Sequence, residues 1–326
     1  MLRSFLINKS YYKVFYILAV GLISFNWVNI DATDSAFTTI KNEEGISVLE
    51  HGKPVFFYQR KPKVAGGKYH FNNYLHPVYN LQGDTLTEEF PEDHFHHRGF
   101  FWAWHQIYIG EKKMGDSWTM DSISQEVASL ETSLKKKEIR LNAKVLWKSF
   151  AIQNEQPFIE ENTIITVHQR ESQTRKIDLE ISLKALVSGV KIGGSEDEKG
   201  YGGFSTRIKL PKNMVFTSEN GAVTPLEGQV HAGKWMDFSA LFEGRQHLES
   251  GMAILCHPTT PNYPAPWILR QNGSMQNIVF PGARRIELPT ERPTILRYRI
   301  IIHNGNANSL DFQKLQSEYG KLYPEK

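Results

Sequence analysis

Alternation of apolar and polar residues dominates the chain after residue 32 and predicts β-strands. In residues 176–185 (KIDLEISLKA) every second residue is apolar, and residues 139–145 alternate in the same way. Residues 158–168 are rich in β-forming side chains, and residues 296–303 (LRYRIIIH) form another such run. Because successive strand side chains point to opposite faces, a period of two indicates strands with one buried face.

A helical pattern is convincing only near the C-terminus. We expect Asn308 or Ser309 to cap this helix and Gly320 to lie near its end. The residues that share one helical face are Phe312, Leu315, Tyr319 and Leu322. Many strands, one helix and no alternation of the two predict an all-β fold, a large β-sandwich of stacked antiparallel sheets with one C-terminal helix.

The N-terminus has the layout of a secretory signal. Three basic residues precede the apolar run 14–25 (VFYILAVGLISF), and polar sequence begins at Asp31. We therefore predict a signal peptide at 1–32 and a single β-rich domain at 33–326, secreted or periplasmic. An uncleaved N-terminal anchor is the alternative, although the apolar run is short for a membrane span. The only cysteine, Cys256, excludes an intramolecular disulfide.

Charge and aromatic content narrow the class of partner. The net charge of +3 falls to +1 without residues 1–32, which hold three basic residues and one acidic residue. Such a chain has no electrostatic footprint for nucleic acid, and no membrane contact is expected after signal removal. Aromatic residues make up 12%, with seven tryptophans, as in proteins that stack on sugars. Trp102 and Trp104 share a strand face and either contact a sugar or fill an aromatic core.

The densest chemistry lies in residues 93–99 (DHFHHRG). If this segment is extended, His94 and His96 share one face and His97 takes the other. Histidines on a common face can act as acid and base near neutral pH. Arg98 can hold a carboxylate through two parallel hydrogen bonds. We interpret this segment as the functional site, and the alternative is a set of structural or surface histidines.

The same histidines raise the question of a metal. Their spacing matches no standard zinc pattern and no cysteine assists, so we predict no cofactor, with a divalent metal at the histidine cluster as the alternative. The chain also lacks a nucleophile elbow, a P-loop and a dinucleotide fingerprint.

Two later segments are further candidates. Residues 199–207 (KGYGGFSTR) join a glycine-rich turn to Tyr201 and Arg207. Residues 257–267 form a proline-stiffened segment that holds His257 and Asn262. The alternatives are an ordinary turn and a rigid connector. We expect the histidine segment to meet Tyr201, Arg207 or His257 in one cleft.

Four segments together resemble one protein family. They are HPVYNLQGDTLTEEFPEDHFHHRGFFWAW (76–104), YGGFSTR (201–207), the loop 257–267 and RYRIIIHNG (297–305). They resemble the exported bacterial proteins of the DUF6807 group, often labelled "methane oxygenase PmoA". Proteins of this kind occur among polysaccharide-degradation genes, so the resemblance implies a β-rich fold and work on carbohydrates.

Within that context we favour β-elimination from uronic-acid-containing oligosaccharides, by an oligosaccharide dehydratase or lyase. We expect a histidine of residues 94–97, or Tyr201, to act as base or acid, and Arg98 or Arg207 to hold the uronate carboxylate. The predicted catalytic residues are His94, His96, His97, Tyr201 and His257. The predicted substrate-binding residues are Arg98, Arg207, His76, Trp102 and Asn262. The alternatives are a glycoside hydrolase using a pair among Asp84, Glu88, Glu89 and Asp93, and a non-catalytic carbohydrate-binding protein.

Overall fold

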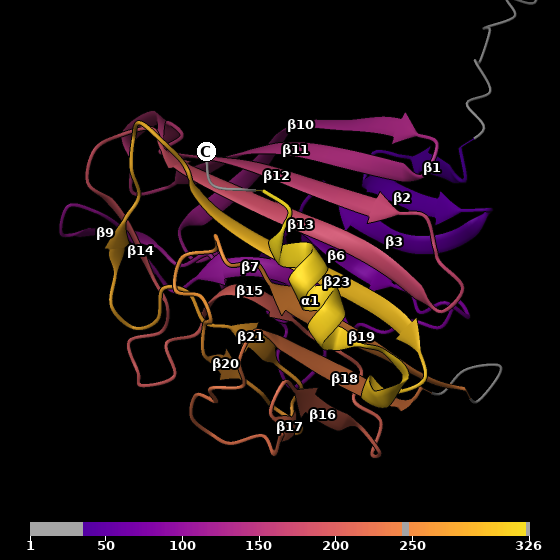
Figure 1. The fold of residues 1–326 in the computed structure, drawn as a ribbon. Helices are drawn as coiled ribbons and strands as arrows, with labels where there is room; N and C mark the ends of the chain where they lie inside the picture. Colours follow the sequence, from indigo (N-terminus) through magenta and orange to yellow (C-terminus); the bar gives the residue numbers. More distant parts are fainter. Residues whose placement is uncertain (1–34, 243–247, 324–326) are drawn as a thin grey trace, which may run out of the picture. The chain divides into compact units, whose positions relative to one another are not determined.

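Two large antiparallel sheets pack face to face and enclose the main core (Figure 1). The computed structural model describes residues 35–242 and 248–323. The first sheet has the order β1 (Phe37–Lys41), β2 (Gly45–Glu50), β3 (Lys53–Gln59), β6 (Tyr74–Val78), β7 (Phe100–Trp104), β15 (Gly202–Thr206), β21 (Gln276–Ile278) and β20 (Trp267–Ile268). The second has the order β10 (Ile123–Lys135), β11 (Glu138–Ser149), β12 (Ile159–His168), β13 (Thr174–Ala185), β23 (Thr294–Asn304), β19 (Glu249–Cys256), β18 (Trp235–Leu241), β16 (Val215–Ser218) and β17 (Gly221–Ala222).

Smaller elements complete the described chain. A four-stranded sheet has the order β22 (Ile286–Glu287), β14 (Val190–Gly193), β8 (Gln106–Ile109) and β9 (Lys112–Gly115), and β4 (Lys63–Ala65) pairs with β5 (Tyr69–Phe71). Two short 3-10 turns cover Gln153–Glu155 and Ala307–Ser309, and one α-helix, α1, covers Phe312–Gly320. The predicted all-β sandwich with one C-terminal helix is therefore confirmed.

The strands predicted from alternation lie side by side in the second sheet. β11, β12, β13 and β23 contain the predicted runs, and β13 pairs antiparallel with both β12 and β23. The apolar positions of β13 are buried; Ile177 and Ile181 are fully inaccessible to solvent. Their alternation reflects one face turned to the opposite sheet, which is what the pattern predicted.

The tryptophans of β7 fill the core. Trp102 and Trp104 both point into it, and the indole of Trp104 lies 5.9 Å from that of Trp147 on the second sheet. Trp102 donates from Nε1 to the buried carboxylate of Glu161 at 2.8 Å. The prediction that Trp102 binds substrate is wrong, because it is 2% exposed and its polar atom already has a protein partner.

Helix α1 covers the outer face of the second sheet beside β23 and β19 (Figure 1). Phe312 and Tyr319 are buried against that sheet, as their spacing predicted. The cap differs from the prediction: Asp311, rather than Asn308 or Ser309, accepts a hydrogen bond from the N–H of Lys314. Asp311 directly precedes the first helical residue, whereas the two predicted residues belong to a separate 3-10 turn. The fourth residue of the predicted face, Leu322, lies beyond the helix end and is 39% exposed.

The predicted signal peptide at 1–32 lies outside the described residues. The division into a signal peptide and one domain at 33–326 therefore stays a prediction. Within the described ranges, no helix is long and apolar enough to cross a membrane.

Candidate functional site

Pairing of β7 with β15 explains why distant segments meet at one place. The two strands are antiparallel, with Phe100 opposite Thr206 and Trp104 opposite Gly202. The histidine loop that enters β7 therefore lies beside Arg207, which leaves β15. At the other end of the pair, His105 leaves β7 beside Tyr201, which enters β15. Residues a hundred positions apart in sequence thus border the same strand pair.

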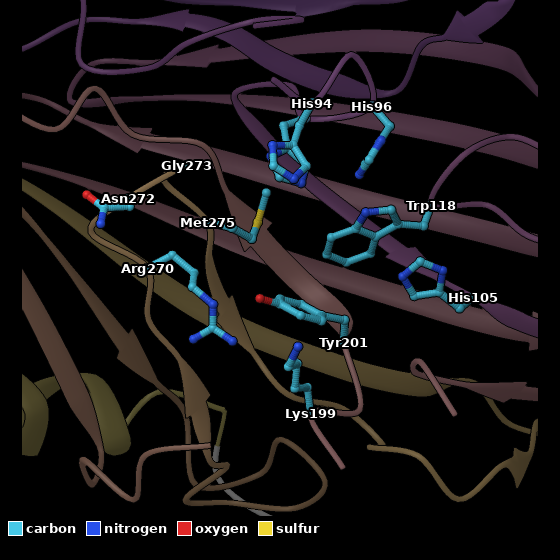
Figure 2. A pocket seen from close by; sticks show the side chains of 11 residues that line it. His94, His96, His105, Trp118, Lys199, Tyr201, Arg270, Asn272, Gly273 and Met275 are labelled. Atoms are coloured by element: carbon cyan, nitrogen blue, oxygen red, sulfur yellow. The ribbon is translucent and has the colours of Figure 1, made fainter. Parts of the chain in front are cut away.

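A cavity of about 400 Å³ opens over this strand pair. The residues that line it are His94, His96, His97, His105, Trp118, Lys199, Tyr201, Arg270, Asn272, Gly273 and Met275 (Figure 2). Its volume falls within the roughly 300–1,000 Å³ typical of ligand pockets. Four of the five residues predicted as catalytic, His94, His96, His97 and Tyr201, are therefore brought together.

The histidine loop is built from successive tight turns and is not the extended segment that we considered. The N–H of His94 donates to the carbonyl of Pro91, and that of His97 donates to the carbonyl of His94, both at 2.9 Å. The N–H of Phe90 closes the loop on the carbonyl of His97. The rings of His94 and His97 consequently stack in parallel with centroids 4.5 Å apart. His97 therefore lies on the same side as His94, contrary to the face predicted for a strand.

Arg207 fixes this loop from the opposite strand. Its Nε donates to Glu88 at 2.9 Å and its Nη2 donates to Asp93 at 3.0 Å. Its Nη1 lies 3.2 Å from Nδ1 of His97 and also donates to the carbonyl of Gly273. The guanidinium is almost fully buried and every direction of donation meets a protein acceptor. The prediction that Arg207 binds substrate is therefore wrong; its role is to position the loop.

These contacts assign the proton positions on two histidines. An arginine can only donate, so Nδ1 of His97 accepts, and the neutral ring carries its proton on Nε2. His94 has the opposite arrangement, because its Nδ1 lies 2.9 Å from a carboxylate oxygen of Asp93 and must donate. The free lone pair of His94 is then on Nε2. The cavity thus receives one imidazole that can accept a proton and one that can donate a hydrogen bond.

The electrostatic surroundings keep the inner histidines neutral. Burial lowers the pKa of His96 to about 4, and the neighbouring His94 and Arg98 act in the same direction. Burial also lowers the pKa of His97 strongly, and the neighbouring His96, His94 and Arg207 act in the same direction. For Asp93, burial opposes ionisation, but hydrogen bonds from His94 and Arg207 outweigh it and lower the pKa.

A second histidine–carboxylate pair forms another wall. Nδ1 of His105 lies 2.9 Å from Oδ2 of Asp116, whose Oδ1 accepts from the N–H groups of Trp118 and Thr119. The ring of His105 stacks on Trp118 at 5.0 Å. His105 is therefore held between the carboxylate of Asp116 and the ring of Trp118.

The side facing the histidines is cationic. Figure 2 shows the hydroxyl of Tyr201 pointing into the cavity, with Arg270 and Lys199 beside it. Burial raises the pKa of Tyr201, so its phenol is protonated at neutral pH. Arg270 donates to the backbone carbonyls of Leu226, Leu269 and Glu227, and its guanidinium also contacts the side chain of Tyr201. Within the described part of the chain no carboxylate pairs with the Arg270 guanidinium, so this positive charge can attract an anion.

Gly273 allows the two sides to approach. Its φ of +66° is a left-handed conformation that favours glycine, and a β-carbon there would lie 3.3 Å from a carboxylate oxygen of Asp93. The turn that carries Asn272 and Gly273 therefore packs directly on the Asp93–His94 pair.

Arg98 does not line the cavity, but it contacts residues that do. Its guanidinium lies between the rings of Phe71 and Phe101, at 4.2 and 4.4 Å from their centroids. It donates to the carbonyls of His96 and Trp118, and burial lowers its pKa to about 9. The prediction that Arg98 holds a substrate carboxylate is wrong, because the side chain is 2% exposed.

Three other predicted residues also lie outside the cavity lining. His257 contacts Tyr319 of α1 on the second sheet and bonds to Thr259, so the structure does not place it with the catalytic candidates. His76 bonds through Nδ1 to Thr87 at 2.9 Å, and burial lowers its pKa to about 4. Asn262 donates to the carbonyl of Val279.

Sequence reasoning missed most of the opposite wall. Arg270 and Met275 flank the turn at Asn272-Gly273, and the sequence indicates the turn but not its neighbours. Trp118 lies in a segment without a recognisable motif. Lys199 and His105 adjoin predicted motifs and could have been included on that ground. No sequence signal identifies Arg270, because its position depends on the pairing of β15 with β21.

The rings of His94, His96 and His97 lie close together, with centroids 4.5–5.6 Å apart. In residues 35–242 and 248–323, no three His, Cys, Asp or Glu side chains are placed to hold a metal ion. Parallel stacking of His94 on His97 keeps their ring nitrogens from converging on one point.

Comparison with known proteins supports the family resemblance. A model described as a family of unknown function, DUF6807, matches residues 45–317. No curated protein matches the chain. Among solved structures, YeaD from Salmonella typhimurium, provisionally named a mutarotase, matches with a TM-score of 0.31 and 9% identity, over 83% of this chain and 94% of that one. A likeness of this size supports no conclusion about substrate or reaction.

Proposed function

The chain belongs to DUF6807, a family of unknown function, and we propose that it is an exported carbohydrate-active lyase that performs β-elimination on uronic-acid-containing oligosaccharides. The observation that carries this proposal is the arrangement around the cavity of about 400 Å³. The imidazoles of the histidine loop form one side, and Tyr201, Lys199 and Arg270 form the other. Export rests on the signal-like N-terminus.

Elimination from a uronate needs each of these groups. The base, His94 Nε2, takes the proton from the carbon that bears the carboxyl group. The electron pair left behind forms a double bond to the neighbouring ring carbon, whose bond to the leaving oxygen breaks. Tyr201 gives its proton to that oxygen, and solvent returns a proton from His94 to Tyr201. The products are an unsaturated uronate and either water, for a dehydratase, or a sugar, for a chain-cleaving lyase.

The developing negative charge needs stabilisation, because a proton next to a carboxylate is only weakly acidic. Arg270 can neutralise the substrate carboxylate, and Lys199, whose Nζ lies 4.0 Å from Oδ2 of Asp197, adds a second positive charge beside it. The Nε2–H of His97 can donate to the enediolate oxygen. A neutral imidazole suits this donor role. Because the pKa of His97 is lowered, the ring is uncharged, and its Nε2–H can donate a hydrogen bond without transferring the proton. Trp118 lines the cavity, but it is 3% exposed and its ring stacks on His105, so its role is to hold His105 in place.

The hydrolase alternative needs two carboxyl groups across the scissile bond. None of the four proposed carboxylates lines the cavity in the described part of the chain. Glu88 and Asp93 are bound to Arg207, Glu89 accepts from Tyr74, and Asp84 accepts from Asn80. The geometry therefore favours elimination over hydrolysis.

The test is incubation of the purified protein with uronate-containing oligosaccharides. We expect a rise in the ultraviolet absorbance of unsaturated uronate, and mass spectrometry should show loss of one water or cleavage without water uptake. Reducing sugar released without an unsaturated product would favour the hydrolase. Binding without any product would favour the non-catalytic binding protein.

The matched variants are His94→Asn and His51→Asn. Asparagine at 94 can still donate to Asp93 but cannot take a proton, so turnover should fall by roughly 10²-fold or more. His51 is an exposed turn residue with a φ of 47°, which asparagine tolerates, and it lies outside the cavity lining. Equal loss of turnover in both variants would refute the assignment of His94.

A further inference from the structure

A second cavity adjoins the proposed active site. Its volume is about 470 Å³, and three residues line both cavities: Lys199, Arg270 and Asn272. In Figure 2 these three side chains form the lower and left margin of the first cavity. The two spaces therefore meet along one row of polar side chains, and a molecule held in the first can extend into the second.

Arg270 also anchors the loop that forms the far wall of the second cavity. Its two terminal nitrogens donate to the carbonyls of Leu226 and Glu227, which belong to the loop after β17. Arg270 also donates to the carbonyl of Leu269, the residue that precedes it. The loop 224–227 is thus anchored to the residue that separates the two spaces, and this anchoring gives the second cavity a defined position relative to the first.

The lining of the second cavity combines polar and apolar groups. Thr224 and Gln271 offer a hydroxyl and an amide, each able to donate and accept hydrogen bonds. Pro225 and Leu226 offer apolar surface. This combination suits a sugar ring, whose hydroxyls need mixed donors and acceptors and whose axial hydrogens form apolar faces.

We propose that the second cavity is a subsite for an uncharged sugar residue joined to the uronate held in the first. The inference rests on the proposed function and adds the substrate class: an oligosaccharide in which the uronate has a neutral neighbour. The charges that line the second cavity disfavour a second uronate there. The two cations on the shared border are taken by the first carboxylate, and the acidic residue Glu227 lines the second cavity. A second anion there would meet this like charge without a cation of its own.

The experiment compares kcat/KM for three probes in a glucuronate series and a galacturonate series. The probes are the methyl glycoside of the uronate, the uronate linked to glucose, and the diuronate. We expect the neutral-neighbour disaccharide to exceed the methyl glycoside by about tenfold or more, the scale of one or two net hydrogen bonds. The diuronate should gain less than the neutral disaccharide.

Two variants connect the difference to the second cavity. Gln271→Ala should reduce the ratio of disaccharide to methyl glycoside, and Glu227→Gln should raise the diuronate relative to the neutral disaccharide. Gln153→Ala, at an exposed residue that lines neither cavity, is the matched control and should leave both ratios unchanged.

The outcomes separate the two proposals. Unsaturated product from the methyl glycoside and the disaccharide at equal kcat/KM would overturn the subsite while leaving the elimination intact. Equal preference for diuronate and neutral disaccharide, unaltered by Glu227→Gln, would overturn the exclusion of charge. No unsaturated product from any probe would overturn the elimination and the inference with it.

Discussion

Replacement of Asp93 by asparagine tests the proposed proton positions most directly. In the native protein the carboxylate accepts from Nδ1 of His94 at 2.9 Å and from Arg207 at 3.0 Å. In Asp93→Asn the amide oxygen can still accept from Arg207, but the amide nitrogen donates to His94. Nδ1 of His94 must then accept, which moves the ring proton to Nε2 and removes the lone pair that takes the substrate proton.

The expected loss of activity is much larger than the loss of stability. Removing a general base costs roughly 10²- to 10⁴-fold in turnover, or about 2.7–5.5 kcal/mol in the barrier. The side chain of Asp93 is 42% exposed, so its ion pair with Arg207 contributes only about 0–1 kcal/mol to folding. Glu88 remains on Arg207 in the variant. The protein should therefore stay folded while kcat falls.

Steady-state kinetics and urea unfolding together measure both effects. We expect kcat to fall with little change in KM, since the substrate carboxylate meets Arg270 and Lys199, which the variant leaves intact. Glu88→Gln is the matched control, because it weakens the other ion pair of Arg207 without touching a histidine. If Glu88→Gln loses as much activity as Asp93→Asn, the reasoning from the His94 proton is refuted.

Other predictions concern stability. Arg98→Lys should lower the free energy of unfolding by about 1–4 kcal/mol in urea, because lysine cannot reproduce the stacking between two aromatic rings; an unchanged midpoint contradicts this. Trp147→Phe should cost about 1–3 kcal/mol in the same assay, since it removes a donor at 2.9 Å from buried Glu161. The melting temperature should fall as the pH drops from about 6.5 to about 4. Over that range the unfolded chain protonates His76 and His96, whose folded pKa values are about 4. His76→Asn should flatten this dependence, and a melting temperature that rises on acidification would contradict it.

The fold was predictable where burial is one-sided. β11 and β13 show their pattern because one face meets the opposite sheet, and α1 shows its pattern through Phe312 and Tyr319. By contrast, β7 has all five residues buried, so no alternation distinguishes its two faces. The short strands of the four-stranded sheet offer too few residues for any period to emerge.

The histidine loop was located correctly, but its shape was not predictable from periodicity. A loop of Asp, His and Phe has no repeating face, and its conformation depends on bonds such as that from His97 N–H to the carbonyl of His94. Those turns reverse the predicted orientation of His97. Local sequence identified the residue types, whereas the backbone path decided which of them share a cavity.

The two arginines that were expected to bind substrate show why residue type alone misleads. Arg207 has five N–H donors, and Glu88, Asp93, His97 and the carbonyl of Gly273 provide acceptors for them. A guanidinium satisfied in this way has nothing left to offer a substrate, and its buried charge instead helps to keep His97 neutral. Arg98 is likewise enclosed, between two aromatic rings. A free anion is attracted where a cation lines the cavity and lacks a carboxylate partner, and among the described residues Arg270 meets both conditions. We therefore assign the uronate carboxylate to Arg270 by comparing the partners of the three arginines. Those partners come from segments far apart in the chain, so the sequence alone could not show them.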